Sequence, residues 1–216
     1  TGKLVFAGGG ALNVKLNQKI LQLPYVDELF VQPVASDAGS ALGAASYATW
    51  KRGIYPEKME HVYLGPSYTS DECSLACDSH EKKPNYRRIE NVVKEAARLL
   101  KEGSPIAWCQ GRMEFGPRAL GGRSILGNPS HAGISDKINK QIKFRERWRP
   151  FCPSILDTIA AEVIQTDHPA PYMTITFDVA KNWAERIPEV VHEDGTSRVQ
   201  IVTKEANPIY YELLKE

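Results

Sequence analysis

Three arginines alternate with glycines in one short stretch of the sequence, GRMEFGPRALGGRS at positions 111–124. Glycines let a backbone approach a ligand closely, because they carry no side chain. The planar guanidinium fork of arginine matches two phosphate oxygens at once. The stretch therefore predicts a loop that binds a phosphorylated small molecule through Arg112, Arg118 and Arg123.

A second basic segment, KFRERWRPF, occupies positions 143–151. In an extended backbone its alternating cations would lie on one side of the chain. These cations are Lys143, Arg145, Arg147 and Arg149. Two other interpretations stay open at this point. One is an exposed segment whose arginine stems cover aromatic rings, and the other is a nucleic-acid patch in which basic side chains alternate with Phe144, Trp148 and Phe151.

Positive charge is concentrated in this part of the chain. Between positions 111 and 150 there are nine basic and three acidic residues, a net charge of +6, whereas the whole chain carries +1. The remaining residues therefore carry −5. So uneven a distribution predicts an anionic ligand for the basic region.

Two turns near the start of the chain also have residues suited to ligand binding. GGG at 8–10 lies between an apolar run and a helical pattern, where backbone N–H groups and the helix dipole favour phosphate or ribose. It departs from the dinucleotide motif G-x-G-x-x-G, because Asn13 takes the place of the third glycine. A turn that requires only glycine backbone angles explains it equally well. Asp37 opens a second helix, where its carboxylate either belongs to the cap or faces a metal or ligand.

Histidine and cysteine spacing predicts no metal site built from histidine alone and no disulfide framework. The five histidines contain neither HxxxH nor HExxH. Four cysteines in 216 residues fit a reducing cytoplasm, which is the expected location, and Cys73 and Cys77 are expected to be buried structural thiols. The longest stretch without Asp, Glu, Lys or Arg has 13 residues, which is too short for a membrane span.

The elements that must position these residues form an α/β pattern without an internal repeat. Apolar spacing predicts strands at 4–7, 28–33, 105–109, 172–179 and 198–203. It predicts helices at 11–21, 36–50, 89–100, 158–165 and from 208 onward. With 42% apolar residues, the 216-residue chain has enough material for one large domain or two smaller ones.

A change in composition divides the chain. Between positions 53 and 69 the sequence contains Pro56, Gly65 and Pro66 and has no helical or alternating period, which is typical of an interdomain connection. We therefore expect a first unit at 1–53, a linker at 54–66 and a second domain at 67–216. The first unit cannot close a core alone, and the sequence starts without Met directly in a strand, so we expect a piece of a longer protein.

Longer motifs connect this sequence to a known family. The strings GRMEFGPRALGGRS (111–124), KFRERWRPFCPS (143–154) and HEDGTSRVQ (192–200) closely resemble, in the same order, the C-terminal half of the NodU/CmcH-type O-carbamoyltransferases, which include tobramycin carbamoyltransferase. AGGGALN (7–13) and DAGSALGAA (37–45) resemble the end of the preceding domain. The departures, none at a charged position, are Gly10, Gly122 and Cys152, where Val, Asn and Ala are usual.

The resemblance implies a fold and an activity. The fold is a YrdC-like twisted mixed sheet domain, preceded by the C-terminal remnant of an actin/sugar-kinase-like domain. The YrdC-like domain would activate carbamoyl phosphate with ATP and Mg²⁺ to carbamoyl adenylate. The kinase-like domain would transfer the carbamoyl group to the hydroxyl of a small-molecule acceptor, a secondary metabolite or glycoconjugate. The alternative is a YrdC-like RNA-binding module without carbamoyl chemistry, although nucleic acid is not the partner we expect.

The resemblance also assigns residues to roles. Carbamoyl phosphate would be bound by Arg118, Arg149 and Arg198. Further substrate and ATP contacts would come from Arg112, Arg123, Lys143, Arg145, Pro150, Phe151 and Ser154.

The resemblance extends to the kinase-like part. Its nucleotide loops would include Gly8, Gly9, Asn13 and Gly39. Asp37 would ligate a divalent metal, expected to be iron, whose two histidine ligands in HxxxH spacing are absent from this chain. The metal and the transfer to an acceptor are therefore expected only in the full-length enzyme, with the N-terminal domain of the same polypeptide as partner. His192 and Asp194 lie in a matched motif but are expected to form a turn beside the core.

Overall fold

Helices and strands alternate along the chain, which a computed structural model describes from residue 2 to residue 216. The strands are β1 (Lys3–Phe6), β2 (Glu28–Val31), β3 (Ile106–Cys109), β4 (Arg123–Leu126), β5 (Ser154–Leu156), β6 (Phe177–Asp178), β7 (Thr196–Ser197) and β8 (Gln200–Val202). The α-helices are α1 (Val14–Leu21), α2 (Ser40–Lys51), α3 (Ser70–Ser79), α4 (Val92–Lys101), α5 (Ile134–Ile138), α6 (Asp157–Ile164), α7 (Lys181–Ala184) and α8 (Pro208–Lys215). Short turns of other helix types are η1 (Gly9–Leu12), η2 (Asp37–Gly39), η3 (Asn139–Lys143) and η4 (Pro188–Val190). The α/β class predicted from the sequence is confirmed.

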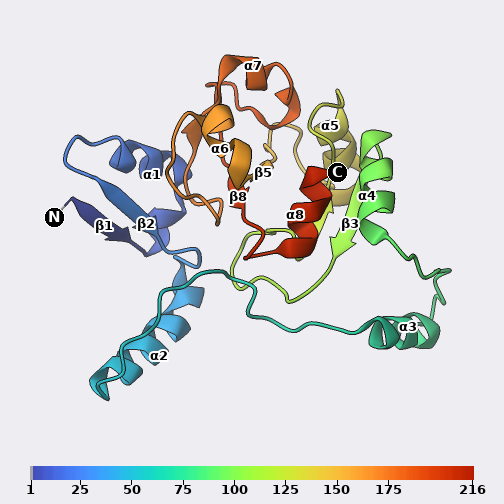
Figure 1. The fold of residues 1–216 in the computed structure, drawn as a ribbon, viewed down its shortest axis with the longest axis horizontal. Coiled ribbons are helices and arrows are strands. Elements are labelled where there is room, and N and C mark those ends of the chain that lie inside the picture. Colours follow the sequence, from blue (N-terminus) through green and yellow to red (C-terminus); the bar gives the residue numbers. More distant parts are fainter. Residues whose placement is uncertain (1) are drawn as a thin grey trace.

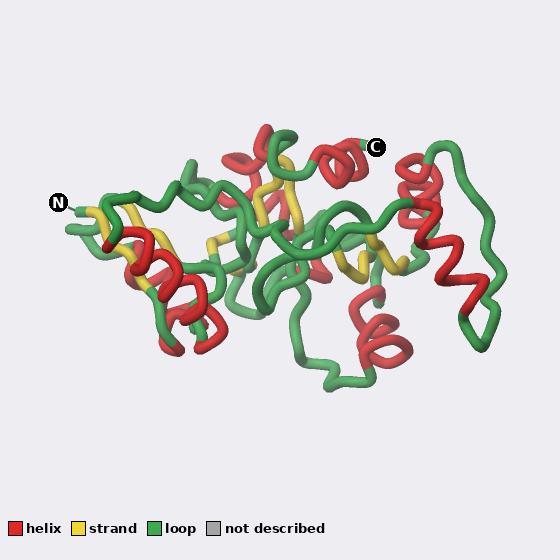
Figure 2. The backbone as a smooth tube through the Cα atoms, turned by 90° about the horizontal axis from the view of Figure 1, so that it is seen from below, coloured by secondary structure: helices red, strands yellow, loops and turns green. Residues whose placement is uncertain are grey.

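The strands of the described residues form four separate pairs rather than one sheet, and loops join most of them (Figure 2). β1 pairs with β2 and β5 with β8 in parallel, whereas β3–β4 and β6–β7 are antiparallel. Each paired segment spans only two to four residues, so each ladder is short. The single twisted sheet expected for 67–216 is not formed in this part of the chain. The YrdC-like and kinase-like assignments stay predictions.

The start of the chain forms a parallel strand pair with one packed helix and one projecting helix (Figure 1). Asn13 caps α1, because its side chain accepts a hydrogen bond from Leu16 N at 3.1 Å. The helix expected from position 11 therefore begins at Val14, after the turn η1. α2 buries none of its residues and extends away from the rest of the molecule.

One apolar core joins the start of the chain to its last third. It packs Leu29 and Val31 of β2 in the same cluster as Val163 of α6 and Phe177 of β6. A buried amide strengthens this contact, since Asn17 Nδ2 donates to the backbone oxygen of Thr174 at 2.7 Å. The segment 1–53 is thus anchored to the residues that follow the linker. The domain boundaries themselves stay predictions.

The last residues of the expected linker dock onto the arginine–glycine loop at 111–124. Gly65 N donates to the backbone oxygen of Met113 at 2.9 Å, and Met113 N donates to that of Pro66 at 3.0 Å. Val62 is 1% exposed and belongs to a small core cluster. This part of the connection therefore serves as a scaffold for the loop.

Local hydrogen bonds explain two differences from the expected elements. The helix expected from position 89 begins at Val92, because the side chain of Asn91 accepts from Lys94 N at 3.0 Å and caps it there. Of the strand expected at 172–179, only Phe177–Asp178 pair, since their partner β7 has two residues.

The sequence interpretation does not include α3, which lies apart from the packed elements (Figure 1). A capping box of Thr69 and Glu72 starts this helix. The helix buries no residue, so the expectation of buried thiols is wrong: Cys73 is exposed and Cys77 only partly covered. Among the helices that the structure describes, none is long and apolar enough to cross a bilayer.

Candidate functional site

Three arginines from distant parts of the chain come together around Cys152. Arg198 lies between β7 and β8, and its Nε donates a hydrogen bond to Cys152 Sγ at 3.0 Å. Burial lowers the pKa of Arg118, and the positive charge of Arg198 lowers it further. Burial also lowers the pKa of Arg145, with the charges of Arg149 and Arg198 acting in the same direction. The guanidinium groups are therefore close enough to repel one another.

Carboxylates balance only part of this charge, since Glu146 acts on Arg145 and Arg149. Arg118, Arg145 and Arg198 form no salt bridge within residues 2–216. Arg149 reaches Glu146 only at 3.8 Å, between exposed side chains. We name Arg118, Arg145, Arg149 and Arg198 the arginine cluster. Like charges held together in this way favour the binding of an anion, which relieves their repulsion.

Buried Asn139 holds the segment that carries two members of the cluster. Its Oδ1 accepts from Arg145 Nε at 2.5 Å, and its Nδ2 donates to the backbone oxygen of Arg149 at 3.4 Å. The guanidinium of Arg145 lies 4.5 Å from the ring centre of Phe151. The residues after η3 form no strand, so the extended row of four cations considered from the sequence is not formed. Lys143 ends η3 and is exposed.

Two arginines of the loop hold its own backbone. Arg112 donates from Nε to Gly65 O at 2.9 Å and from Nη2 to Leu64 O at 2.7 Å. Arg123 donates from Nη1 to Gly122 O at 2.9 Å and to Gln110 O at 3.1 Å. Since these donors already have carbonyl partners, Arg112 and Arg123 fix the loop, whereas Arg118 of the same loop is left for the cluster.

Glu114 organises this loop from inside, a role that the sequence analysis missed. Its carboxylate is buried and accepts backbone hydrogen bonds from Leu120 at 2.8 Å, Gly122 at 2.7 Å and Arg123 at 3.1 Å. A carboxylate that accepts several N–H groups holds a turn in one conformation. The signal in the sequence was a lone acidic residue among the cations of the loop.

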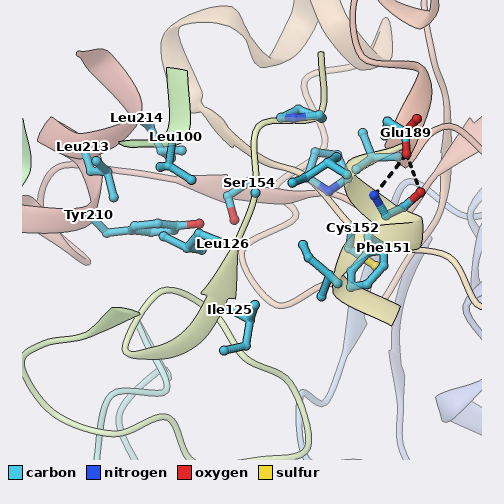
Figure 3. A pocket seen from close by; sticks show the side chains of 17 residues that line it. Leu100, Ile125, Leu126, Phe151, Cys152, Ser154, Glu189, Tyr210, Leu213 and Leu214 are labelled. Carbon is cyan, nitrogen blue, oxygen red and sulfur yellow. Dashed lines mark hydrogen bonds between the residues drawn. The ribbon is translucent and has the colours of Figure 1, made fainter. Parts of the chain in front are cut away.

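A mainly apolar cavity of about 150 Å³ is lined by residues of several elements (Figure 3). Cys152 and Phe151, which contact the arginines, line it together with Leu126 and Tyr210. Burial raises the pKa of Tyr210 to about 12. Ser154, also at this cavity, donates its hydroxyl to Gln200 Oε1 at 2.9 Å.

An open pocket of about 680 Å³ adjoins the same segment. Arg149 and Pro150 line it, together with Trp148. The opposite wall contributes His192 and Asp194 of the third matched motif. The positive charge of Arg198 acts on His192 as well as on Arg118, so this pocket and the arginine cluster are neighbours.

The expected nucleotide loops also meet in the structure. Gly8, Asp37 and Gly39 line one pocket of about 360 Å³ at the start of the chain, whereas Gly9 and Asn13 do not. A Cβ on Gly39 would lie 2.0 Å from Val34 O, so only glycine fits there. No three His, Cys, Asp or Glu side chains gather into a metal-binding group in the described residues. Asp37 alone does not fit a metal centre.

The fold is that of an α/β protein, and its arginine cluster adjoins an open pocket. Residues 97–216 match the family model described as Carbamoyltransferase C-terminus, and residues 1–46 match the one described as Carbamoyltransferase N-terminus. The chain belongs to the carbamoyltransferase family. The resemblance drawn from its motifs is confirmed.

Curated relatives match almost the whole chain. Nodulation protein NolO of Bradyrhizobium diazoefficiens is 37% identical over 98% of this chain, and nodulation protein U of Rhizobium tropici is 35% identical over 99%. An uncharacterized protein of Synechocystis is 35% identical over 99%. The chain spans 40%, 35% and 39% of the lengths of these three relatives. None of these matches favours the RNA-binding alternative.

Proposed function

We propose that this chain binds carbamoyl phosphate and ATP and forms carbamoyl adenylate, the activated intermediate of an O-carbamoyltransferase. The observation that carries the proposal is the arginine cluster, in which Arg118, Arg145 and Arg198 converge without a carboxylate partner among the described residues. Membership of the carbamoyltransferase family supports the carbamoyl group as the group to be transferred.

The proposed reaction converts carbamoyl phosphate, ATP and water into carbamoyl adenylate, pyrophosphate and phosphate. Water cleaves the bond between the carbamoyl group and its phosphate, which leaves carbamate and inorganic phosphate. A carbamate oxygen then becomes bonded to the α-phosphorus of ATP, and the bond from that phosphorus to pyrophosphate breaks. Both substrates are anions that repel each other, so fixed cations are needed to bring them together and to stabilise the charge that develops. ATP enters with Mg²⁺, which neutralises part of the triphosphate charge.

The surroundings of the cluster support separate places for carbamoyl phosphate and for ATP. Arg118 and Arg198 lie beside Cys152, where guanidinium forks suit the phosphate of carbamoyl phosphate. Arg149 lines the open pocket of about 680 Å³, a volume within the usual range for sites of nucleotide size. The apolar cavity lined by Phe151 and Cys152 would give the site one apolar side.

Transfer to an acceptor hydroxyl belongs, in this proposal, to the whole carbamoyltransferase. The pocket formed by Gly8, Asp37 and Gly39 would contribute a nucleotide loop to that second step. The acceptor class we propose is a secondary metabolite or glycoconjugate. No step is assigned to a metal, because Asp37 is its only expected ligand in this chain.

Exchange of labelled pyrophosphate into ATP tests the proposal, because reversible adenylate formation returns the label to ATP. We expect exchange only when carbamoyl phosphate is present. Arg149→Ala should abolish it. Arg98→Gln is the matched control, since Arg98 lies on the exposed face of α4 and pairs with Glu95 and Glu102.

Absence of exchange in this chain would be followed by the same assay on the longer protein that contains it. Recovery there would mean that adenylate formation requires further residues of the polypeptide. Absence in both proteins would contradict the proposal.

A further inference from the structure

A hydroxyl group fixes the proton of His192. Lys15 Nζ donates to Thr196 Oγ1 at 2.8 Å, and Thr196 Oγ1 donates to Asp194 Oδ1 at 2.6 Å. Nδ1 of His192 lies 3.3 Å from the same oxygen. A hydroxyl has one proton and two lone pairs, and Thr196 already gives its proton to a carboxylate that cannot donate one. Nδ1 must therefore be the protonated nitrogen and the donor.

The other ring nitrogen of His192 is then a bare acceptor. Nε2 is shielded from solvent and has no hydrogen-bond partner within the described chain. Burial lowers the pKa of His192 below its usual 6.5, and the charges of Lys15 and Arg198 oppose the attraction of Asp194. A neutral ring with a buried, unsatisfied acceptor is costly unless a donor reaches it.

The position of His192 indicates where such a donor comes from. His192 lines the open pocket together with Arg149, and the charge of Arg198 acts on it. A ligand gripped by the arginine cluster is an anion, so the missing donor is an uncharged N–H or O–H on that anion. Carbamoyl phosphate has such a group in its amino group.

We infer that Nε2 of His192 accepts a hydrogen bond from the amino group of carbamoyl phosphate and thereby selects it over acyl phosphates. The inference rests on the function proposed above. Acetyl phosphate has the same shape, with a methyl in place of the amino group. Acetyl phosphate would cover Nε2 of His192 without donating a hydrogen bond to it. A site that is built to bind an N–H group rejects such analogues strongly.

Residues 147–149 form a wall of the pocket that His192 also lines, and a ligand in this pocket would reach Nε2 from there. This wall belongs to no helix or strand, and its Trp148 side chain is 79% exposed. The Arg147–Asp136 ion pair and the hydrogen bonds from Asn139 to the backbone oxygens of Arg147 and Arg149 hold this segment, so in this inference the binding energy of the anion displaces it. The network of Lys15, Asp194 and Thr196 holds the imidazole in place from the other side.

Calorimetric titration of the chain with carbamoyl phosphate, acetyl phosphate and inorganic phosphate tests the inference. We expect the unaltered chain to prefer carbamoyl phosphate over acetyl phosphate by about tenfold or more, as one satisfied buried hydrogen bond implies. His192→Leu should remove the preference and keep the binding of inorganic phosphate. His192→Gln, which restores an acceptor, should regain part of the preference.

His168→Leu is the matched control. His168 is also partly buried, has a pKa lowered by burial and has an unpartnered ring nitrogen, but it contacts Leu29 rather than the cluster. The His168→Leu variant should retain the full preference for carbamoyl phosphate over acetyl phosphate. If His192→Leu keeps the preference while the unaltered chain binds carbamoyl phosphate, the inference is overturned and the proposed function stands. If the unaltered chain binds neither carbamoyl phosphate nor inorganic phosphate, both are contradicted.

The pH dependence gives a second readout. The charged groups that face His192 are Asp194, Lys15 and Arg198, and the pocket also contains Arg147, Arg149, Glu189 and Glu193. Protonation turns Nε2 from an acceptor into a donor as the pH falls through a value below 6.5. The ratio of the two affinities, in which titration of the phosphate groups largely cancels, should stay constant above pH 6.5 and fall toward one in acid. A ratio that does not change with pH would contradict the inference.

Discussion

Arg198 donates a hydrogen bond from Nε to Sγ of Cys152 at 3.0 Å, which ties a thiol to the centre of the arginine cluster. Cys152 therefore gives this chain a chemical probe of its own site. Any group added to the sulfur would occupy space beside the arginines.

Labelling of Cys152 should therefore depend on the anion. We expect phosphate to slow the reaction of Cys152 with iodoacetamide and the adduct to weaken phosphate binding at least tenfold, because the added amide occupies the site. Mass spectrometry of the digested protein measures the labelling, and calorimetric titration of the intact adduct measures its affinity for phosphate. Cys73 and Cys109 are exposed and serve as internal controls that should react equally with and without phosphate. Equal labelling of Cys152 in both conditions would place the anion elsewhere, and Cys152→Ala should bind phosphate normally.

Glu114→Gln should destabilise the chain by about 2 kcal/mol, because the charge that strengthens the hydrogen bonds from Leu120 N and Gly122 N is lost and an amide donor replaces the oxygen that accepts from Arg123 N. The change in the free energy of unfolding is measured by urea denaturation. Glu102→Gln, at an exposed helix pair, is the control and should leave the midpoint unchanged. A stable Glu114→Gln variant would show that the loop does not depend on this carboxylate.

Gly121→Ala should be among the costliest glycine substitutions in the loop. Gly121 has a φ of +94°, and an added Cβ would lie 2.2 Å from Cδ1 of Tyr210. Left-handed strain and overpacking together should cost about 3 kcal/mol. Gly53→Ala isolates the strain, since Gly53 has a φ of +78° with open space around it, and should cost about 1 kcal/mol. Thermal unfolding compares the two, and equal losses would contradict the close contact with Tyr210.

Lys15→Met should reduce stability in a pH-dependent way. Lys15 forms an ion pair with Asp194, and its hydrogen bond, with those from Thr196, holds the pKa of Asp194 well below its usual 3.8. The folded state thus binds this proton less readily, so the contribution is complete above pH 3.8 and decreases as the pH falls below it. Both side chains are nearly half exposed, so the difference at pH 7 should be less than about 1 kcal/mol. A difference that grows toward acid in urea titrations would contradict the assignment.

Local signals in the sequence were sufficient for several elements. Pro208 starts α8 as expected, and an apolar run after Gly103 gives β3. The phosphate-binding chemistry that alternating glycine and arginine predict for the loop stays a prediction. These features depend on neighbouring residues alone.

The division of labour among the arginines could not be predicted in this way. Arg112 and Arg118 stand six positions apart in one motif, yet Arg112 is held by the carbonyls of Leu64 and Gly65, which come from the expected linker. The docking of the linker segment onto the loop at 111–124 decides which arginine holds the loop backbone. The role of Glu114 depends on the same long-range contact, since a bridge pairs it with Tyr63.

The most direct test of the central claim is the affinity for carbamoyl phosphate of variants that differ only in which arginine is removed. Arg198→Gln should weaken binding at least tenfold, because Arg198 lies in the cluster without a carboxylate partner. Arg123→Gln would mix loop collapse with binding, so the control is Arg88→Gln, whose exposed side chain pairs with Asp71 and lines neither pocket of the site. We predict stoichiometric binding that Arg198→Gln reduces and Arg88→Gln leaves nearly unchanged. Equal affinities in all three proteins would contradict the assignment of the arginine cluster as the carbamoyl phosphate site.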